Sequence, residues 1–222
     1  MALGVLRQKE GRYALRLLGS SGIFDSGALR SAAALADHYG DGTITATSRG
    51  TLEVGGILEE ALGEALAEAE CLGLRVGGTG ATVRAVTACK GSVCTKGLFD
   101  VRALAEELDE AFVGLPVPKK FKIGVFGCPN SLGKAQGQDV GIQPHLPFDG
   151  TFDLYLGGRM GRVPAFGRAL GRPLRREQVV PAVAVILASY QERALDGERF
   201  QTLLEREPGL LDELRERLGE LG

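Results

Sequence analysis

Three cysteines lie in two loops that could bind a metal. Cys89 and Cys94 lie in the segment ACKGSVCTKG, and Cys128 lies in FGCPN. Each loop follows an apolar segment of extended character, so backbone amides can point at the sulfurs of an iron–sulfur cluster and offset its charge. Free cysteines are also common as small apolar fillers of a core. Two cysteines in one glycine-containing loop, with a third beside Pro-Asn, favour a metal site over core packing.

Zinc is the competing metal for these cysteines. Structural zinc is generally held by four nitrogen or sulfur ligands, which lie closer together in the sequence than these cysteines do. The two histidines do not supply the missing ligands, because His38 is expected near a helix end and His145 in a turn. Cys71, on the apolar face of an expected helix, is interpreted as core packing. Zinc is therefore the weaker alternative.

The first third of the chain has the periodicity of a small α+β sandwich. The segment 11–19 alternates like a strand, and 42–56 is rich in threonine and β-branched residues, which indicates one strand or two joined near Arg49-Gly50. Apolar stripes at helical spacing run through 25–40 and 57–73. The order strand, helix, strands, helix is typical of a ferredoxin-like fold.

The rest of the chain is expected to place the cysteine loops beside a helix and a strand. Residues 97–112 have helical periodicity, and a short buried strand is expected directly before Cys128. A further strand is expected at 152–158. From about Arg175 the chain is expected to be helical, and it ends in two short helices separated by a break at Pro208-Gly209.

Composition limits the classes of partner. The chain has 222 residues, 44% hydrophobic and 24% charged, which is typical of a globular protein. With a net charge of −2 and no basic block, nucleic acid is not expected as a partner, although a few basic residues could still bind a small anion. No apolar run reaches membrane-spanning length and no signal peptide is seen, so a cytoplasmic protein with reduced or metal-bound cysteines is expected.

Three segments of the sequence resemble the sulfite and nitrite reductase family, whose members carry siroheme and a 4Fe-4S cluster. They are ITATSRGTLEVGGI, ACKGSVCTKGLFD and KKFKIGVFGCPNSLGKAQGQDVGI. The most specific part is the order of a cysteine pair, then KFK, an apolar strand and Gly-Cys-Pro-Asn about thirty residues later. The resemblance runs from about Tyr13 to Gly158. It covers one module of the tandem repeat found in larger members, so the small single-module sulfite reductases are the nearer comparison.

The resemblance assigns ligands to the cluster. It implies that Cys89, Cys94 and Cys128 bind the iron of the 4Fe-4S cluster. Asn130 matches the asparagine between the last two cysteines of the family and is implied to lie at the cofactor.

The resemblance also assigns four basic residues to the anion. Arg16 and Arg49 look like the arginines that meet siroheme carboxylates or the anionic substrate, so Arg49 is both a cofactor-binding and a catalytic candidate. Lys120 and Lys122 look like the lysines that bind and help to protonate sulfite or nitrite, and they share one face if their segment is extended. Six-electron reduction of an oxyanion needs such cations, besides a low-potential electron source and an iron site.

The sequence departs from the family at residue 132. The last two family cysteines are separated by three residues, and the second bridges the cluster and the siroheme iron, but position 132 is leucine. The first cysteine pair also has four intervening residues, where larger members have five. Three outcomes stay open. A cluster could rest on three cysteines with a fourth ligand from water, substrate, Ser131 or another chain. Siroheme could bind without a thiolate link or not at all. Both centres could be lost while the fold is kept.

The resemblance therefore implies an α+β chain with three parts. They are a ferredoxin-like half (1–78), a 4Fe-4S and siroheme-binding α/β half (79–172) and a C-terminal helical extension (173–222). The implied function is an oxidoreductase that passes electrons through the cluster to siroheme and reduces sulfite or nitrite, and Leu132 argues against efficient catalysis. The alternatives are a non-catalytic module that binds a tetrapyrrole or a partner, and a cluster-only electron relay. The implied partners are a small oxyanion, a low-potential donor such as a ferredoxin and, by analogy with the tandem members, a second copy in a homodimer.

Overall fold

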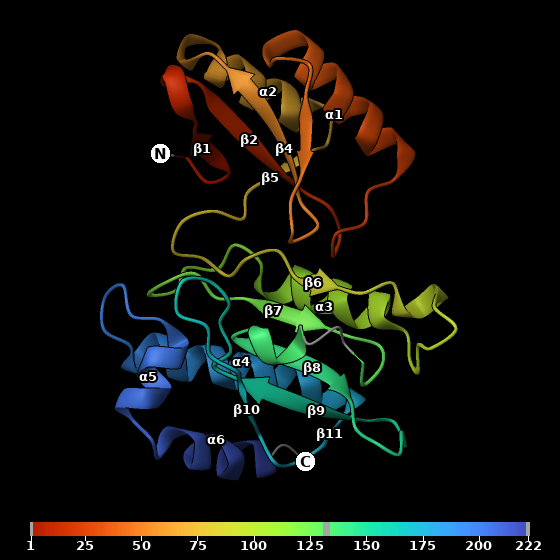
Figure 1. Ribbon diagram of the computed structural model, residues 1–222, viewed down its shortest axis with the longest axis vertical. Helices are drawn as coiled ribbons and strands as arrows, with labels where there is room; N and C mark the ends of the chain where they lie inside the picture. The colour runs from red at the N-terminus through yellow and green to blue at the C-terminus, as the bar shows by residue number, and fades with distance from the viewer. Residues whose placement is uncertain (1, 131–133, 221–222) are drawn as a thin grey trace. The chain divides into compact units, whose positions relative to one another are not determined.

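The computed structural model describes residues 2–130 and 134–220 (Figure 1). The chain divides into two compact units, Met1–Gly80 and Ala81–Gly222. Each unit has its own sheet and its own apolar core.

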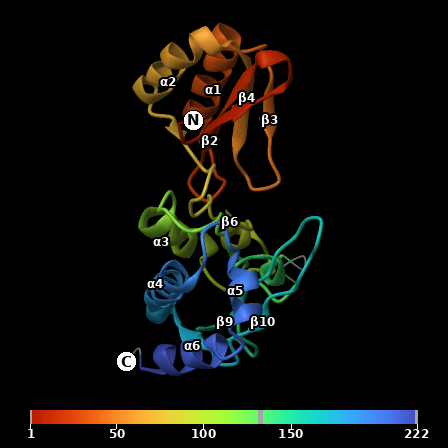
Figure 2. The same ribbon diagram turned by 90° about the vertical axis from the view of Figure 1, so that its left-hand side faces the viewer.

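The first unit is a five-stranded antiparallel sheet with two helices. Its strand order is β1-β2-β4-β3, and β5 pairs with β2. Figure 2 shows both helices on one side of this sheet, and apolar side chains between the two layers form the core. The elements are β1 (Val5–Arg7), β2 (Tyr13–Leu18), α1 (Ser26–Tyr39), β3 (Ile44–Ala46), β4 (Leu52–Ile57), α2 (Leu62–Cys71) and β5 (Arg75–Val76).

Local sequence signals explain where several of these elements begin. α1 follows Asp25, whose carboxylate accepts a hydrogen bond from the Ala28 amide at 2.7 Å and so caps the helix. The expectation of strands within 42–56 is confirmed as the hairpin of β3 and β4. The helix predicted from residue 57 begins only at Leu62, because Ile57 is the buried last residue of β4 and a 3₁₀ turn follows it.

The interpretation of Cys71 as core packing is wrong. Its side chain is exposed at the last residue of α2. The buried face of α2 is formed by Ala65 and Ala69, which are one helical turn apart, and Cys71 lies off that stripe.

The second unit is a six-stranded mixed sheet with helices. Its strand order is β10-β9-β8-β7-β6, and β11 pairs with β9. β6, β7 and β8 are parallel, whereas the remaining pairings are antiparallel. The elements are β6 (Thr87–Ala88), α3 (Val101–Phe112), β7 (Ile123–Val125), β8 (Val140–Pro144), β9 (Thr151–Leu156), β10 (Arg168–Ala169), β11 (Leu174–Arg175), α4 (Arg176–Arg193), α5 (Phe200–Arg206) and α6 (Leu210–Gly219).

The C-terminal helices belong to the core of this second sheet. Val179 of α4 and Leu203 of α5 are fully buried in the same apolar cluster as Ile123 of β7. The predicted break at Pro208-Gly209 is confirmed between α5 and α6. No helix within residues 2–130 and 134–220 is long and apolar enough to cross a bilayer.

Candidate metal centre

The three candidate cysteines line one cavity of about 300 Å³ in the second unit. Cys89 directly follows β6, Cys94 follows a 3₁₀ turn at Gly91–Val93, and Cys128 lies three residues after β7. β6 and β7 are adjacent parallel strands, so the loops at their carboxyl ends meet at the same edge of the sheet, the usual position of ligand sites in such sheets. Topology therefore brings together cysteines that lie 39 positions apart in the sequence.

Glycine lets the two cysteine loops approach each other closely. A Cβ atom added to Gly127 would lie 2.7 Å from Val101 Cγ2 and 3.0 Å from Gly91 Cα, and one added to Gly97 would lie 1.9 Å from the Gly91 carbonyl oxygen. A larger residue at Gly97 would require the Gly91 backbone to shift, and one at Gly127 would require the Val101 side chain to move. The approach also brings the Gly127 amide to 3.2 Å from Cys89 Sγ, to which it donates a hydrogen bond. Such a bond stabilises negative charge on the sulfur.

A polar contact anchors the loop between Cys89 and Cys94 to α3. Asp100 caps α3 by accepting hydrogen bonds from the amides of Arg102 (3.1 Å) and Ala103 (3.2 Å). The hydroxyl of Ser92, inside the cysteine loop, donates to the same carboxylate oxygen at 2.6 Å. The hydrogen bonds from Ser92 and the helix amides lower the pKa of Asp100.

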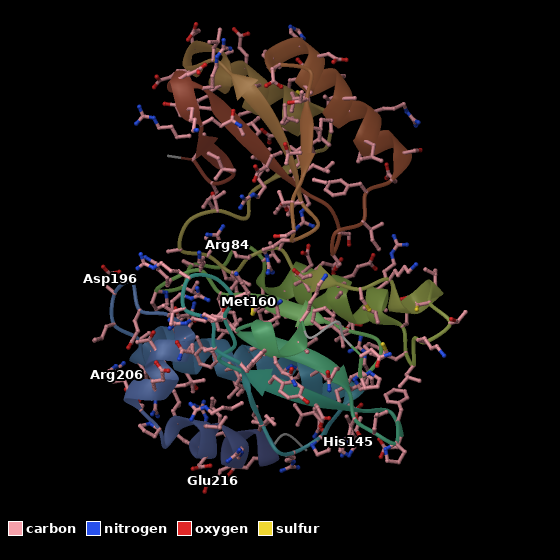
Figure 3. The ribbon with its side chains drawn as sticks, viewed as in Figure 1. Arg84, His145, Met160, Asp196, Arg206 and Glu216 are labelled. Carbon is pink, nitrogen blue, oxygen red and sulfur yellow. The ribbon has the colours of Figure 1, made fainter. Side chains whose placement is uncertain are left out.

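We expect Asp100→Ala to destabilise the second unit by about 1 kcal/mol, the usual cost of losing a helix N-cap. Because the pKa of Asp100 is lowered in the folded chain, its contribution is present above the carboxyl's unfolded value and is lost as the pH falls through the folded value. Urea denaturation should therefore show a larger difference between wild type and variant at pH 7 than at pH 3. Asp196→Ala, at an exposed loop residue labelled in Figure 3, is the control, and an equal effect of both substitutions would contradict the capping role.

The arrangement of the cysteines fits a cluster better than a single zinc ion. Among residues 2–130 and 134–220, no three His, Cys, Asp or Glu side chains come close enough to hold one metal ion. Structural zinc needs four donors about 2.0–2.3 Å from one point. A cluster takes each cysteine at a different iron, so its ligands can lie farther apart around one cavity. The expectations about Ser131 and Leu132 fall outside the described residues.

The cavity is also bordered by residues that the sequence interpretation missed. Lys90, Lys96 and Lys134 line it with the cysteines, as does the predicted Asn130, and these four side chains are exposed. Lys90 directly follows Cys89 and Lys96 lies two residues after Cys94 in ACKGSVCTKG, so their positions in the loop were a usable signal. Positive charge at this rim offsets the negative charge of thiolates.

The predicted lysines of the second unit lie on an extended segment. Lys120 is exposed, Phe121 is fully buried and Lys122 is half-buried. This alternation agrees with the expectation that both lysines share one face. Partial desolvation of its ammonium group, followed by the positive charges of Arg199 and of Arg84, the latter labelled in Figure 3, lowers the pKa of Lys120.

The predicted arginines lie in the first unit. Arg16 on β2 donates from Nε (3.0 Å) and Nη2 (2.6 Å) to Glu53 Oε1 on β4, and from Nη1 to the Gly78 carbonyl oxygen at 2.9 Å. Arg49 lies in the turn between β3 and β4, where its amide donates to Thr47 Oγ1 at 3.3 Å. The arginines and the lysines therefore belong to different units, and their roles at an anion site stay predictions.

Comparison with known proteins supports the family resemblance across both units. The nitrite and sulphite reductase 4Fe-4S domain matches residues 79–220, and the nitrite/sulfite reductase ferredoxin-like half domain matches residues 5–70. The NAD(P)H nitrite reductase of Bacillus subtilis is 30% identical over 201 residues, which are 90% of this chain and 24% of that protein. The coenzyme F420-dependent sulfite reductase of Methanocaldococcus jannaschii is 31% identical over 141 residues, 63% of this chain and 23% of that protein.

A solved structure shows the same fold. The Mycobacterium tuberculosis NirA protein superposes with a TM-score of 0.80 at 19% identity, over 93% of this chain and 39% of that one. The chain spans about a quarter of the length of the two curated relatives described above. The predicted α+β class and the resemblance are both confirmed: the chain belongs to the nitrite and sulphite reductase 4Fe-4S domain family and carries the ferredoxin-like half domain ahead of that domain.

Proposed function

We propose that this chain is a redox protein that binds a 4Fe-4S cluster through Cys89, Cys94 and Cys128, passes electrons to siroheme and reduces sulfite or nitrite by six electrons. The observation that carries the proposal is that all three cysteines line one cavity at the carboxyl ends of two parallel strands. When bound, the cluster supplies low-potential electrons. A ferredoxin-like donor and a homodimer are part of the proposal.

The residues around the cavity would stabilise the charge of the cluster. The Gly127 amide donates a hydrogen bond to Cys89 Sγ and would offset charge that this sulfur shares with a bound cluster. Lys90, Lys96 and Lys134 at the rim add positive charge, which water screens because these side chains are exposed.

Lys120 and Lys122 would bind the oxyanion and supply protons. Reduction of sulfite or nitrite consumes protons as well as electrons, so an acid near the operating pH accelerates it. The lowered pKa of Lys120 moves that ammonium group toward this range. Arg16 and Arg49 would add positive charge for siroheme carboxylates or substrate.

A cluster-only electron relay is the second candidate. Leu132 supplies no ligand where the family has its bridging cysteine. Arg16 is ion-paired with Glu53 inside its own unit, which reduces the positive charge that it can offer to an anion. A relay needs neither a bridging thiolate nor an anion pocket.

The proposal is tested by iron, acid-labile sulfide and absorption measurements on protein purified without oxygen from cells that make siroheme. We expect about five iron (four in the cluster and one in siroheme) and about four sulfide per chain, together with a haem band. Iron and sulfide without a haem band would favour the relay, and folded protein with no iron would contradict both candidates.

Leu132→Cys gives a sharper version of the same test. It restores the fourth cysteine of the family pattern, so we expect the variant to retain iron longer in air than wild type. The matched control is Leu146→Cys, which adds a thiol at a leucine that is 50% exposed, outside the cavity. If both variants retained iron equally long in air, the result would contradict the assignment of position 132 to the cluster.

A further inference from the structure

A buried carboxylate lies among the basic residues of the second unit. Asp139 has no exposed surface. Its two carboxylate oxygens each accept from Arg199 Nη2 at 3.1 Å, and Oδ2 also accepts from the Lys122 amide at 2.9 Å. Since a buried carboxylate is stable only when it is paired and hydrogen-bonded, these contacts are what allow it to lie there. Asp139 thus joins the start of α5 to the extended segment that carries Lys122.

A second C-terminal side chain holds the other end of that segment. The hydroxyl of Tyr190, in α4, hydrogen-bonds to the carbonyl oxygen of Lys119 at 3.3 Å and to that of Glu198 at 2.5 Å. Burial raises the pKa of Tyr190, so the hydroxyl keeps its proton and remains a donor. Tyr190 therefore holds the backbone at Lys119, and Asp139 holds it at Lys122. Asp139 is 17 positions from Lys122 in the sequence, and Tyr190 is 71 positions from Lys119.

The charges around Lys120 are mostly positive. Lys119, Arg84 and Arg199 all lower its pKa, after burial, and Asp139 acts in the opposite direction. One buried acid among these cations reduces their mutual repulsion while it leaves the cluster net positive. A net positive cluster with a fixed backbone suits the binding of a small anion.

We propose that Asp139 is a positioning residue for the oxyanion: clamped by Arg199, it fixes the backbone at Lys122 so that Lys120 and Lys122 present their ammonium groups in one direction. The inference rests on the proposed function, because it takes the two lysines as the anion-binding groups. It adds a role for the C-terminal helices, which supply Arg199 and Tyr190.

The test measures sulfite binding and amide exchange in the whole chain carrying its cofactors. We expect Asp139→Asn to weaken sulfite binding about tenfold and to speed hydrogen exchange at the Lys122 amide about tenfold, the loss associated with a hydrogen bond to a charged acceptor. The matched control is Asp153→Asn in β9, whose carboxylate pairs with His145 instead. A purely structural role would change thermal stability without this combined change in sulfite affinity and Lys122 exchange.

Three further variants separate the possible failures. If Lys120→Ala and Lys122→Ala leave sulfite binding unchanged, the lysine assignment in the proposed function fails, and this inference with it. If the lysine variants lose binding and folded Asp139→Asn does not, the inference alone is overturned. Should Asp139→Asn not fold, Arg199→Lys keeps a charge partner for Asp139 but loses the two-oxygen contact. A smaller loss of sulfite affinity in Arg199→Lys then supports the inference, and unchanged affinity overturns it.

Discussion

Replacing Cys128 by alanine should reduce the iron and acid-labile sulfide of the purified chain to a small fraction of the wild-type amount. The substitution removes one of three thiols that line the cavity, and residue 132 offers no thiol to replace it. Two remaining cysteines leave half of the usual four cluster ligands. Iron and sulfide assays and the absorption spectrum, on protein purified without oxygen, measure the loss.

Cys71→Ala is the matched control for this experiment. Cys71 is exposed at the end of α2 in the first unit and does not line the cavity. The control should therefore bind iron and sulfide as wild type does. A similar loss in both variants would mean that the cavity cysteines have been assigned the wrong role.

Arg199→Met is expected to have the largest effect on stability, about 3–5 kcal/mol. Asp139 is fully buried, and Arg199 is the cation that both of its oxygens contact. Methionine fills part of the arginine volume but leaves the carboxylate without its ion pair. Urea denaturation at pH 8, with Arg162→Met on an exposed loop as the control, measures the difference.

The loss should depend on pH in a defined direction. Burial already raises the pKa of Asp139, and removal of Arg199 raises it further, because the guanidinium opposes that shift. A carboxyl whose folded pKa lies above its unfolded value binds more protons when folded, so the variant loses stability as the pH rises between the two values. The destabilisation should therefore be smaller at pH 5 than at pH 8. The same loss at both pH values would show that Asp139 stays charged without Arg199.

Sequence patterns predicted the elements with strong periodicity. The stripe that ends at Phe112 gave α3, and Pro208-Gly209 marked the gap between α5 and α6. The predicted start of α2 was wrong. Ile57 fits both the apolar stripe of a helix and the end of a buried strand, and only tertiary packing decides between the two. Strands of two residues, such as Arg168–Ala169, have too few positions to show a period of two.

The candidate site was predictable only where its residues belong to recognisable sequence motifs. Cys89, Cys94 and Cys128 carried a recognisable order, and they line one cavity. The contact of Asp139 with Arg199 joins positions that are 60 apart in the sequence. Neither residue belongs to a sequence motif that would predict the contact. Such a pair follows from the packing of α5 against the sheet, which no local pattern encodes.

The shared core of the second sheet and the C-terminal helices has a consequence for synthesis on the ribosome. Cys128 is translated before any residue of α4, α5 or α6. Val179 of α4 and Leu203 of α5 lie in the same apolar cluster as Ile123 of β7. A nascent chain with all three cysteines therefore still lacks much of the core that supports the strand before Cys128. The proposed cluster is therefore expected to be inserted only after α4, α5 and α6 have left the ribosome.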